Sequence, residues 1–207
     1  MVSMVQDSPV LRAIRSRRSI RRYRAEPVPQ TLVEAVLDAA RWAPSAHNRQ
    51  PWRFAVLRGQ APKERLAVAM GARLRADRLA DGDGAGDVER DVSRSHARIA
   101  SAPVVIVACL SMADMDVYAD ARRGDAERAM AVQSTALAVQ NLLLAAHALG
   151  LGACWLCAPL FCPDTVREAL GLPADWEPQA LVTMGWPGET KTKERVALAQ
   201  RVVYVKA

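Results

Sequence analysis

Arginine and serine alternate near the N-terminus of this chain in a pattern that suits a phosphate group. In "RSRRSIRR", single residues separate Arg17, Ser19 and Arg21, so in an extended or loop conformation their side chains point the same way. Two forked guanidiniums and a hydroxyl would satisfy phosphate oxygens. The alternative is a solvated basic face at the end of a helix. A second alternating pair, Lys193 and Arg195 in "ETKTKERVAL", would make sense if both basic segments closed on the same phosphate.

A second polar cluster lies in "APSAHNRQPW", between a helical pattern and a strand-like one. Pro44 ends the helix because it lacks an N–H and restricts the residue before it. Ser45, Asn48 and Gln50 then present short donors and acceptors. Such groups suit the edge of a flat heteroaromatic ring that carries carbonyls and ring nitrogens. The alternative is a turn that only closes the corner between helix and strand, which leaves the segment starting at Gln50 unexplained.

The elements that must position these residues follow from the hydrophobic periodicity. The pattern predicts one domain over residues 1–207, with a mixed α/β sheet and helices packed on it. Predicted helices cover about 8–16, 30–42, 62–79, 87–99, 125–149 and 163–170; predicted strands cover 53–58, 103–110, 152–157 and 179–185, and an extended arm follows at 201–205.

Two segments leave alternatives open. From Ala136 to Leu149 the long helix is apolar nearly all round, and such a helix must be surrounded by protein. It is either a central helix shared with a second subunit or the central helix of a monomer. The Gly- and Asp-rich segment from Leu79 to Glu89 is either a mobile lid or a solvent-exposed linker.

Composition and charge narrow the functional classes. The net charge is +6, but basic residues are dispersed among acidic ones, and no nucleic-acid-binding signature accompanies them. No nucleic-acid partner is therefore predicted. No G-x-G-x-x-G follows a strand, and no P-loop occurs. The apolar run Val104–Leu110 is shorter than the ~18 residues of a membrane span, and the N-terminus lacks a long apolar segment. The sequence predicts a cytoplasmic protein with no membrane contact.

The cysteines and tryptophans have structural interpretations. Cys154, Cys157 and Cys162 have a spacing that invites a metal or redox site, but a cluster needs four ligands, and Cys109 lies in a continuous apolar strand. We interpret them as free thiols that act as small buried hydrophobes, and no metal site is predicted. The tryptophans, Trp42 among them, are interpreted as packing anchors.

Several motifs, taken in order, resemble the FMN-dependent nitroreductase superfamily. They are "RRSIRRY", "APSAHNRQPWRF", "VQNLLLAAHALGLGACW", "APLF", "LVTMGWP" and "TKERV", and they extend over nearly the whole chain. Within that superfamily, "LRADRLADGDGAGDVERDVSRSHARIASAP", "YADARRGDAERAM" and "GLPADWEP" resemble the C-terminal domain of the bifunctional ligase of coenzyme F-420 biosynthesis. That domain is FMN-dependent and reduces a dehydro precursor of the deazaflavin. This chain has no room for the ligase domain, and it keeps the "HNRQPW" typical of general nitroreductases.

The resemblance implies a fold and a site. The sheet would be mainly antiparallel, the long helix would lie at the interface of a homodimer, and the C-terminal arm would reach the partner. FMN would lie at that interface. The residues implied are Arg17, Arg18, Ser19, Arg21, Lys193 and Arg195 around the phosphate and ribityl chain; Pro44, Ser45, Ala46, Asn48 and Gln50 from the partner; and Cys157, Ala158, Pro159 and Leu160 along the isoalloxazine. Many relatives have an acidic residue and a glycine where this chain has Phe161 and Cys162.

The resemblance also implies an activity. Hydride would pass in a ping-pong mechanism from NAD(P)H through FMN to a nitroaromatic, quinone-like or dehydro-deazaflavin acceptor, and no acid–base triad is needed because the cofactor carries the chemistry. One alternative is the reductase step of coenzyme F-420 biosynthesis. Two others are a flavin destructase, which cleaves reduced FMN, and a non-catalytic flavin-binding protein.

Overall fold

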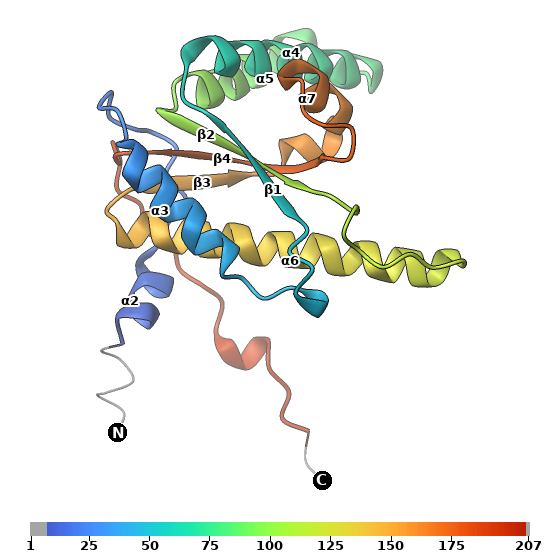
Figure 1. Cartoon of the computed structure of the whole chain (residues 1–207). Coiled ribbons are helices and arrows are strands. Elements are labelled where there is room, and N and C mark those ends of the chain that lie inside the picture. Colours follow the sequence, from blue (N-terminus) through green and yellow to red (C-terminus); the bar gives the residue numbers. More distant parts are fainter. Residues whose placement is uncertain (1–7, 206–207) are drawn as a thin grey trace.

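A four-stranded antiparallel sheet forms the centre of the fold in this computed structural model, which describes residues 8–205 (Figure 1). Residues 1–7 and 206–207 lie outside it. The predicted arm at 201–205 lies within it and is exposed, outside any helix or strand. The strands are β1 (Trp52–Leu57), β2 (Val104–Leu110), β3 (Gly152–Leu156) and β4 (Glu177–Gly185), in the order β1-β2-β4-β3. The mainly antiparallel sheet is thus confirmed; within the described residues, the parallel pairing is one isolated bridge between Ser19 and Ala153.

Helices cover both faces of the sheet (Figure 1). On one face lie α3 (Gln30–Arg41) and α6 (Ala121–Ala148); on the other lie α4 (Gln60–Ala80), α5 (Ala85–Ala100) and α7 (Pro163–Leu170). The short helix α2 (Pro9–Ser16) is joined to the end of α6 by a 2.7 Å hydrogen bond between Ser16 Oγ and His147 Nε2. The described residues also form three 3₁₀ turns: η1 (Ala46–Asn48), η2 (Ala158–Phe161) and η3 (Leu198–Gln200).

The central strands explain the apolar run in the sequence. β2 is buried along its whole length, because β1 and β4 pair with its two edges and helices cover its two faces. A strand buried on both faces has no reason to alternate polar and apolar residues. Two apolar cores result, one on each face of the sheet.

The long helix α6 begins four residues earlier than predicted. Its first turn, "ARRG", carries no apolar periodicity, but Asp120 caps it by accepting a hydrogen bond from Arg123 N at 3.0 Å. Ala138, Leu142 and Ala146 pack against α3 and the sheet, whereas Leu137 is 45% exposed. One chain therefore surrounds this helix only in part. Among the described helices, α6 is the one long and apolar enough to cross a membrane; its buried stripe is that of a core helix.

The lid alternative for the Gly- and Asp-rich segment is wrong. α4 continues to Ala80 and α5 starts at Ala85, so a tight exposed turn, with Gly82 at φ 86°, joins two packed helices. Arg78 holds this corner by pairing with Asp83 and, at 2.6 Å, with Asp91. The composition of this segment suggests flexibility and does not reveal the ion pairs. In the structure, most of the segment belongs to the two helices that these ion pairs join.

Truncation of the α6 core tests this packing. Leu142→Ala is expected to lower the free energy of unfolding by about 2–5 kcal/mol, because it leaves a cavity between α6, α3 and the sheet. Leu79→Ala, at a 46% exposed position in α4, is expected to change it by less than about 0.5 kcal/mol. Urea unfolding followed by circular dichroism measures both. Similar losses for the two variants would contradict this assignment of the core.

Candidate active site

The alternating basic segment leaves α2 and runs along the free edge of β3. Ile20 N donates a 3.1 Å hydrogen bond to Ala153 O, and Arg24 N donates a 2.9 Å bond to Trp186 O. The approach is close: a Cβ on Gly152 would lie 2.8 Å from Ile20 Cγ2. The segment is therefore fixed through its backbone, between β3 and the chain that follows β4.

Two half-buried polar side chains hold this segment in place. The Tyr23 hydroxyl lies 2.6 Å from Ile20 O and 2.9 Å from Thr183 O, and burial raises its pKa. Glu189 Oε1 accepts from Arg21 N at 2.7 Å and lies 3.0 Å from Lys191 Nζ. Burial by itself would raise the pKa of Glu189, but the Arg21 N–H and the Lys191 ammonium hold it below its usual value.

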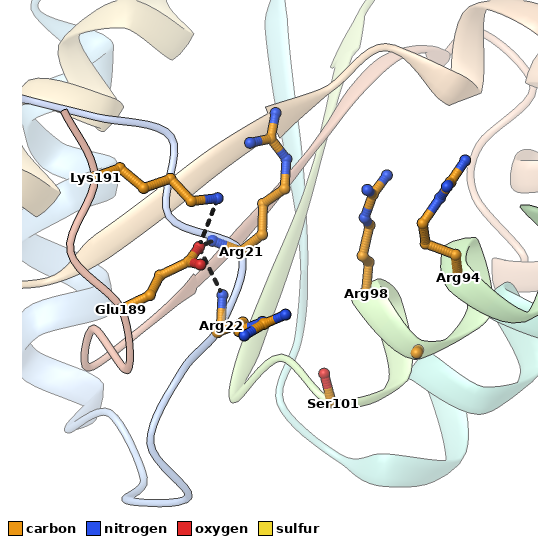
Figure 2. Close-up of a pocket in the computed structure, with 8 residues that line it drawn as sticks. Arg21, Arg22, Arg94, Arg98, Ser101, Glu189 and Lys191 are labelled. Atoms are coloured by element: carbon orange, nitrogen blue, oxygen red, sulfur yellow. Dashed lines mark hydrogen bonds and ion pairs between the residues drawn. The ribbon is translucent and has the colours of Figure 1, made fainter. Parts of the chain in front are cut away.

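These contacts leave the arginine side chains to line a cationic pocket of about 420 Å³ (Figure 2). Its lining residues are Arg21, Arg22, Glu189 and Lys191 together with Arg94, Ala97, Arg98 and Ser101 of α5 and its end. Figure 2 shows the side chains of Arg21, Arg94 and Arg98 pointing the same way. Among the described residues, the Arg21 and Arg98 guanidiniums make no hydrogen bond or ion pair, so they are available to an anion.

The structure separates the predicted phosphate residues into groups. Ser19 and Arg21 lie together: burial raises the pKa of the Cys154 thiol, and both residues beside it act to lower that pKa. Arg17 is half-buried at the end of α2. Arg18 points elsewhere, because its Nη1 donates to Arg15 O at 2.6 Å and to Arg17 O at 2.8 Å.

The second predicted basic pair is not brought to this pocket within the described chain. Lys193 and Arg195 lie on an exposed segment beyond it, and the residue that reaches the pocket is Lys191. Lys191 belongs to the same alternating "KTKER" pattern, so this pattern does indicate a contact with the pocket. The prediction placed that contact two residues too far along the chain. Glu189, Arg94 and Arg98 were missed, since nothing in the local sequence ties them to the N-terminal segment.

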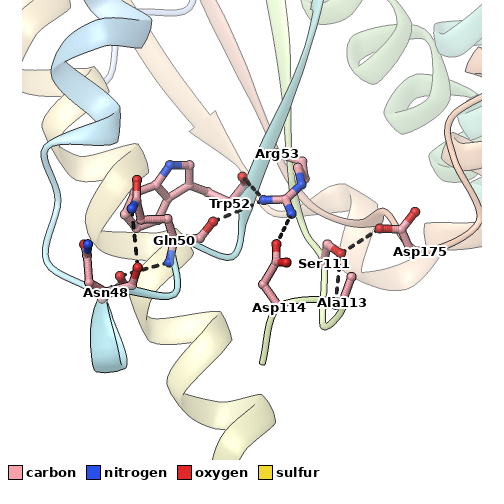
Figure 3. A network of polar contacts seen from close by, with 9 residues as sticks. Asn48, Gln50, Trp52, Arg53, Ser111, Ala113, Asp114 and Asp175 are labelled. Atoms are coloured by element: carbon pink, nitrogen blue, oxygen red, sulfur yellow. Dashed lines mark hydrogen bonds and ion pairs between the residues drawn. The ribbon is translucent and has the colours of Figure 1, made fainter. Parts of the chain in front are cut away.

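The predicted polar loop is a rigid turn at the start of β1 (Figure 3). Gln50 N donates to Ser45 Oγ at 3.0 Å. Arg53 Nη1 donates to Gln50 O at 3.1 Å, and Arg53 Nη2 donates to Asp114 Oδ2 at 2.7 Å. The Asn48 side chain makes no hydrogen bond within the described residues. Positive φ angles, which are strained for residues other than glycine, occur at His47 (49°), Asn48 (56°) and Gln50 (50°).

The third predicted group lies at the far end of β3. Cys157, Ala158 and Leu160 follow the strand and are at least partly exposed, while Pro159 is buried and anchors η2. Leu160 N donates to Cys157 O at 3.1 Å and so closes the turn. The prediction of a buried thiol is confirmed at Cys109, Cys154 and Cys162 but is wrong at Cys157, because β3 ends before it.

The basic segment and the polar loop of one chain lie at diagonally opposite corners of the sheet. Trp52 pairs with Leu110 at one end of the sheet, on edge strand β1. Ala153, on edge strand β3, lies level with Val104 at the other end, because both pair with Met184. Three strand spacings of ~4.8 Å and about six residues of ~3.4 Å separate these corners by about 25 Å. A single small ligand would not touch both corners of one chain.

Comparison with known proteins assigns this chain to a protein family. The profile of the nitroreductase family matches residues 14–186. The chain belongs to the nitroreductase family. An NADH dehydrogenase of Thermus thermophilus is 31% identical over 211 residues, which cover 90% of this chain and 91% of that protein. A protein of Desulfovibrio desulfuricans assigned as a nitroreductase, solved in complex with FMN, is 32% identical, with a TM-score of 0.75 and coverage of 97% and 99%.

The family assignment confirms the broad prediction and leaves the narrow one open. Membership of this family and the names of the relatives make the chain an oxidoreductase. A further relative, from Methanothermobacter thermautotrophicus, is assigned as an NADH dehydrogenase/NAD(P)H nitroreductase. It is 31% identical over 187 residues, which cover 89% of this chain and 81% of that protein. The resemblance to the coenzyme F-420 ligase domain stays a prediction.

The contacts of Glu189 with Arg21 N and Lys191 should make the free energy of unfolding depend on pH. Because its folded-state pKa lies below the ordinary 4.5, ionised Glu189 stabilises the fold at higher pH, and this contribution is lost as the pH falls through the lower folded-state value. The difference in free energy of unfolding between wild type and Glu189→Gln should be largest near neutral pH and shrink below pH 4.5. Urea unfolding at a series of pH values checks this; a difference that grows on acidification would contradict it.

Proposed function

We propose that this chain is an FMN-dependent oxidoreductase that takes hydride from NAD(P)H and works as a homodimer with FMN between its subunits. The observation that carries the proposal is the cationic pocket at the edge of β3, in a nitroreductase whose relative of known structure holds FMN. We treat residues 1–207 as a single FMN-binding domain.

The donor set on the edge of β3 fits FMN. Arg21, with Ser19 beside it, and Lys191 offer charged and neutral donors to a phosphate at one end. The exposed turn after the strand, Cys157–Leu160, lies at the other end. The five residue steps from Gly152 to Cys157 span about 17 Å, which suits a ligand with a phosphate at one end and a flat ring at the other. Beyond the bridge at Ala153, the edge of β3 pairs with no other described strand, so its backbone groups can bond ring carbonyls and nitrogens.

Each group of residues has a separate role in this proposal. FMN, when bound, supplies the two-electron chemistry that links a nicotinamide donor to an acceptor. Arg17, Ser19 and Arg21 hold its phosphate and ribityl chain, and Arg98 adds positive charge that favours negative charge on the ligand. The turn Cys157–Leu160 orients the ring. The fixed backbone of these segments means that little ordering is left to occur on binding.

In a homodimer, the two groups that lie far apart in one chain can come from different subunits and form one site. In a two-fold interface, residue i of one subunit meets residue j of the other and the reverse contact also forms. The basic corner of one chain can therefore meet the polar loop of its partner, twice per dimer. Exposed apolar side chains along α6 and beside the polar loop support this: Leu137 of α6, Leu149 directly after it, and Trp42, which is 72% exposed. The prediction of Trp42 as a packing anchor within the chain is wrong, because it lies past the end of α3.

A second candidate is the reductase step of coenzyme F-420 biosynthesis. The stretch that resembles that enzyme forms the α4–α5 hairpin, and α5 supplies Arg94 and Arg98 to the cationic pocket. Two remaining candidates are separated by simple observations. A flavin destructase would consume reduced FMN in air, and a non-catalytic binder would hold FMN that NAD(P)H does not bleach.

Removal of Arg21 tests the phosphate site. Hydrogen bonds to charged groups contribute about 1.5–3 kcal/mol, so Arg21→Ala should weaken FMN binding by about 10- to 100-fold at ~1.4 kcal/mol per decade. Arg21→Lys, which keeps the charge but not the fork, should fall between. Arg122→Ala, exposed at the start of α6, is the matched control. FMN titration measures all four proteins, and wild-type affinity in Arg21→Ala would remove this residue from the site.

A further inference from the structure

A second hollow with a positively charged lining lies at the end of the sheet where β1 stops and β2 starts. It shares no lining residue with the cationic pocket. Its volume is about 430 Å³, within the range of about 300–1,000 Å³ that is usual for small-molecule pockets. Two of its lining residues are cations and none is an anion. The lining residues are Ala25, Pro27, Val28, Arg58, Gly59, Lys63 and Pro103.

Lys63 holds a buried charge in this hollow. It is the fourth residue of α4 and only 5% exposed, and its Nζ donates to Ala102 O at 2.7 Å. That carbonyl accepts one of the three ammonium hydrogens but does not neutralise the charge, and Lys63 forms no ion pair within the described chain. Burial accordingly lowers the pKa of Lys63. Because buried charges are normally paired, a bound anion would stabilise this ammonium.

Arg58, directly after β1, also keeps its charge. Its Nη1 donates to Gln30 Oε1 and its Nη2 to Val28 O at 2.7 Å, and both acceptors are neutral. Two carboxylates are near in the chain. Glu34 accepts from Gln30 Nε2 at 2.8 Å and so lies one side chain away from the guanidinium, whereas Glu26 is exposed and does not line the hollow. The two hydrogen bonds therefore orient Arg58 without neutralising it.

The start of α4 adds to this positive potential. Its N-cap is Gly59, which lines the hollow and has no side chain to accept hydrogen bonds, and its first turn contains no acidic residue. The first N–H groups of a helix lack partners inside the helix and carry a partial positive charge. A lysine in this place is repelled by that charge, and a bound anion would interact favourably with both.

We propose that this hollow binds a phosphate group that does not belong to FMN. Arg58 and Lys63 supply the charged donors, and the N–H groups at the start of α4 supply neutral ones. Pro27, Val28 and Pro103 form an apolar part of the wall, so the phosphate is either a free ion or the head of a small monoester. None of these residues is assigned to FMN, so the inference stands apart from the proposed function.

Calorimetric titration with inorganic phosphate tests this site in the protein saturated with FMN, at an ionic strength held constant with chloride. We expect one phosphate to bind per chain. Arg58→Gln and Lys63→Met each remove a charged donor and should raise the Kd about tenfold, equivalent to ~1.4 kcal/mol. Arg98→Ala, in the cationic pocket, and Arg122→Ala, on the surface of α6, are the controls and should leave the Kd unchanged.

Two further measurements use the wild-type protein and do not depend on how the Lys63 variant folds. Tungstate, a tetrahedral dianion, is soaked into crystals and should give an anomalous peak between Arg58 and Lys63. Phenyl phosphate is then compared with inorganic phosphate by calorimetry. Tighter binding of phenyl phosphate assigns the hollow to a monoester, and equal or weaker binding assigns it to the free ion.

Three results would overturn the inference. Phosphate could fail to bind against the chloride background. Arg98→Ala could abolish binding while Arg58→Gln leaves it intact, or tungstate could appear only beside Arg98, and either result would place the anion in the cationic pocket. Arg122→Ala could weaken binding as much as Arg58→Gln, which would reduce the effect to net charge. The variants distinguish the two cavities with or without bound FMN, so a protein that binds no FMN would end the proposed function and leave this test intact.

Discussion

The antiparallel pairing of β1, β2, β4 and β3 places the two polar groups of one chain about 25 Å apart, and the arrangement of the proposed site follows from this separation. Hydrogen bonds along three strand pairs make the distance rigid, so no side-chain rearrangement closes it. In the proposed homodimer, the exposed apolar side of α6 and the exposed Trp42 would have a common physical reason. A second copy would cover them and bring opposite corners together.

Within each corner, backbone contacts hold the segment and side chains stay free. Ile20 and Arg24 bond through the backbone, Tyr23 is pinned between Ile20 and Thr183, and Glu189 accepts the Arg21 N–H. The Arg21 guanidinium keeps its donors for a ligand. The polar loop follows the same logic, since Ser45 and Arg53 fix its backbone while the Asn48 amide remains uncommitted. Rigid segments with free donors reduce the ordering that binding requires.

The sequence predicted the element types well, because periodicity reports burial directly. The apolar run Val104–Leu110 is the central strand β2. Helix α3 ends at Arg41, shortly before Pro44, as the proline predicts. Features set by single polar contacts escaped it. The Asp120 cap places the start of α6 four residues before the predicted one. The ion pair between Arg78 and Asp91 joins α4 to α5 through a tight turn, where composition alone allowed a lid. For the site, the alternation of Ser19 and Arg21 was readable, whereas Arg98 and Glu189 join them through tertiary folding, which local spacing does not encode.

Mixed dimers test most directly whether each FMN site is built from two chains. Arg21→Ala alters one corner, and Asn48→Gly removes the outward amide at the other while tolerating its positive φ of 56°. The two variants are co-expressed with different tags, and the mixed dimer is isolated and titrated with FMN. We expect one site of wild-type affinity in each mixed dimer, because one of its two sites then combines the intact corners of both chains. If both sites are as weak as in the variant homodimers, each site belongs to a single chain and the proposed shared site is wrong.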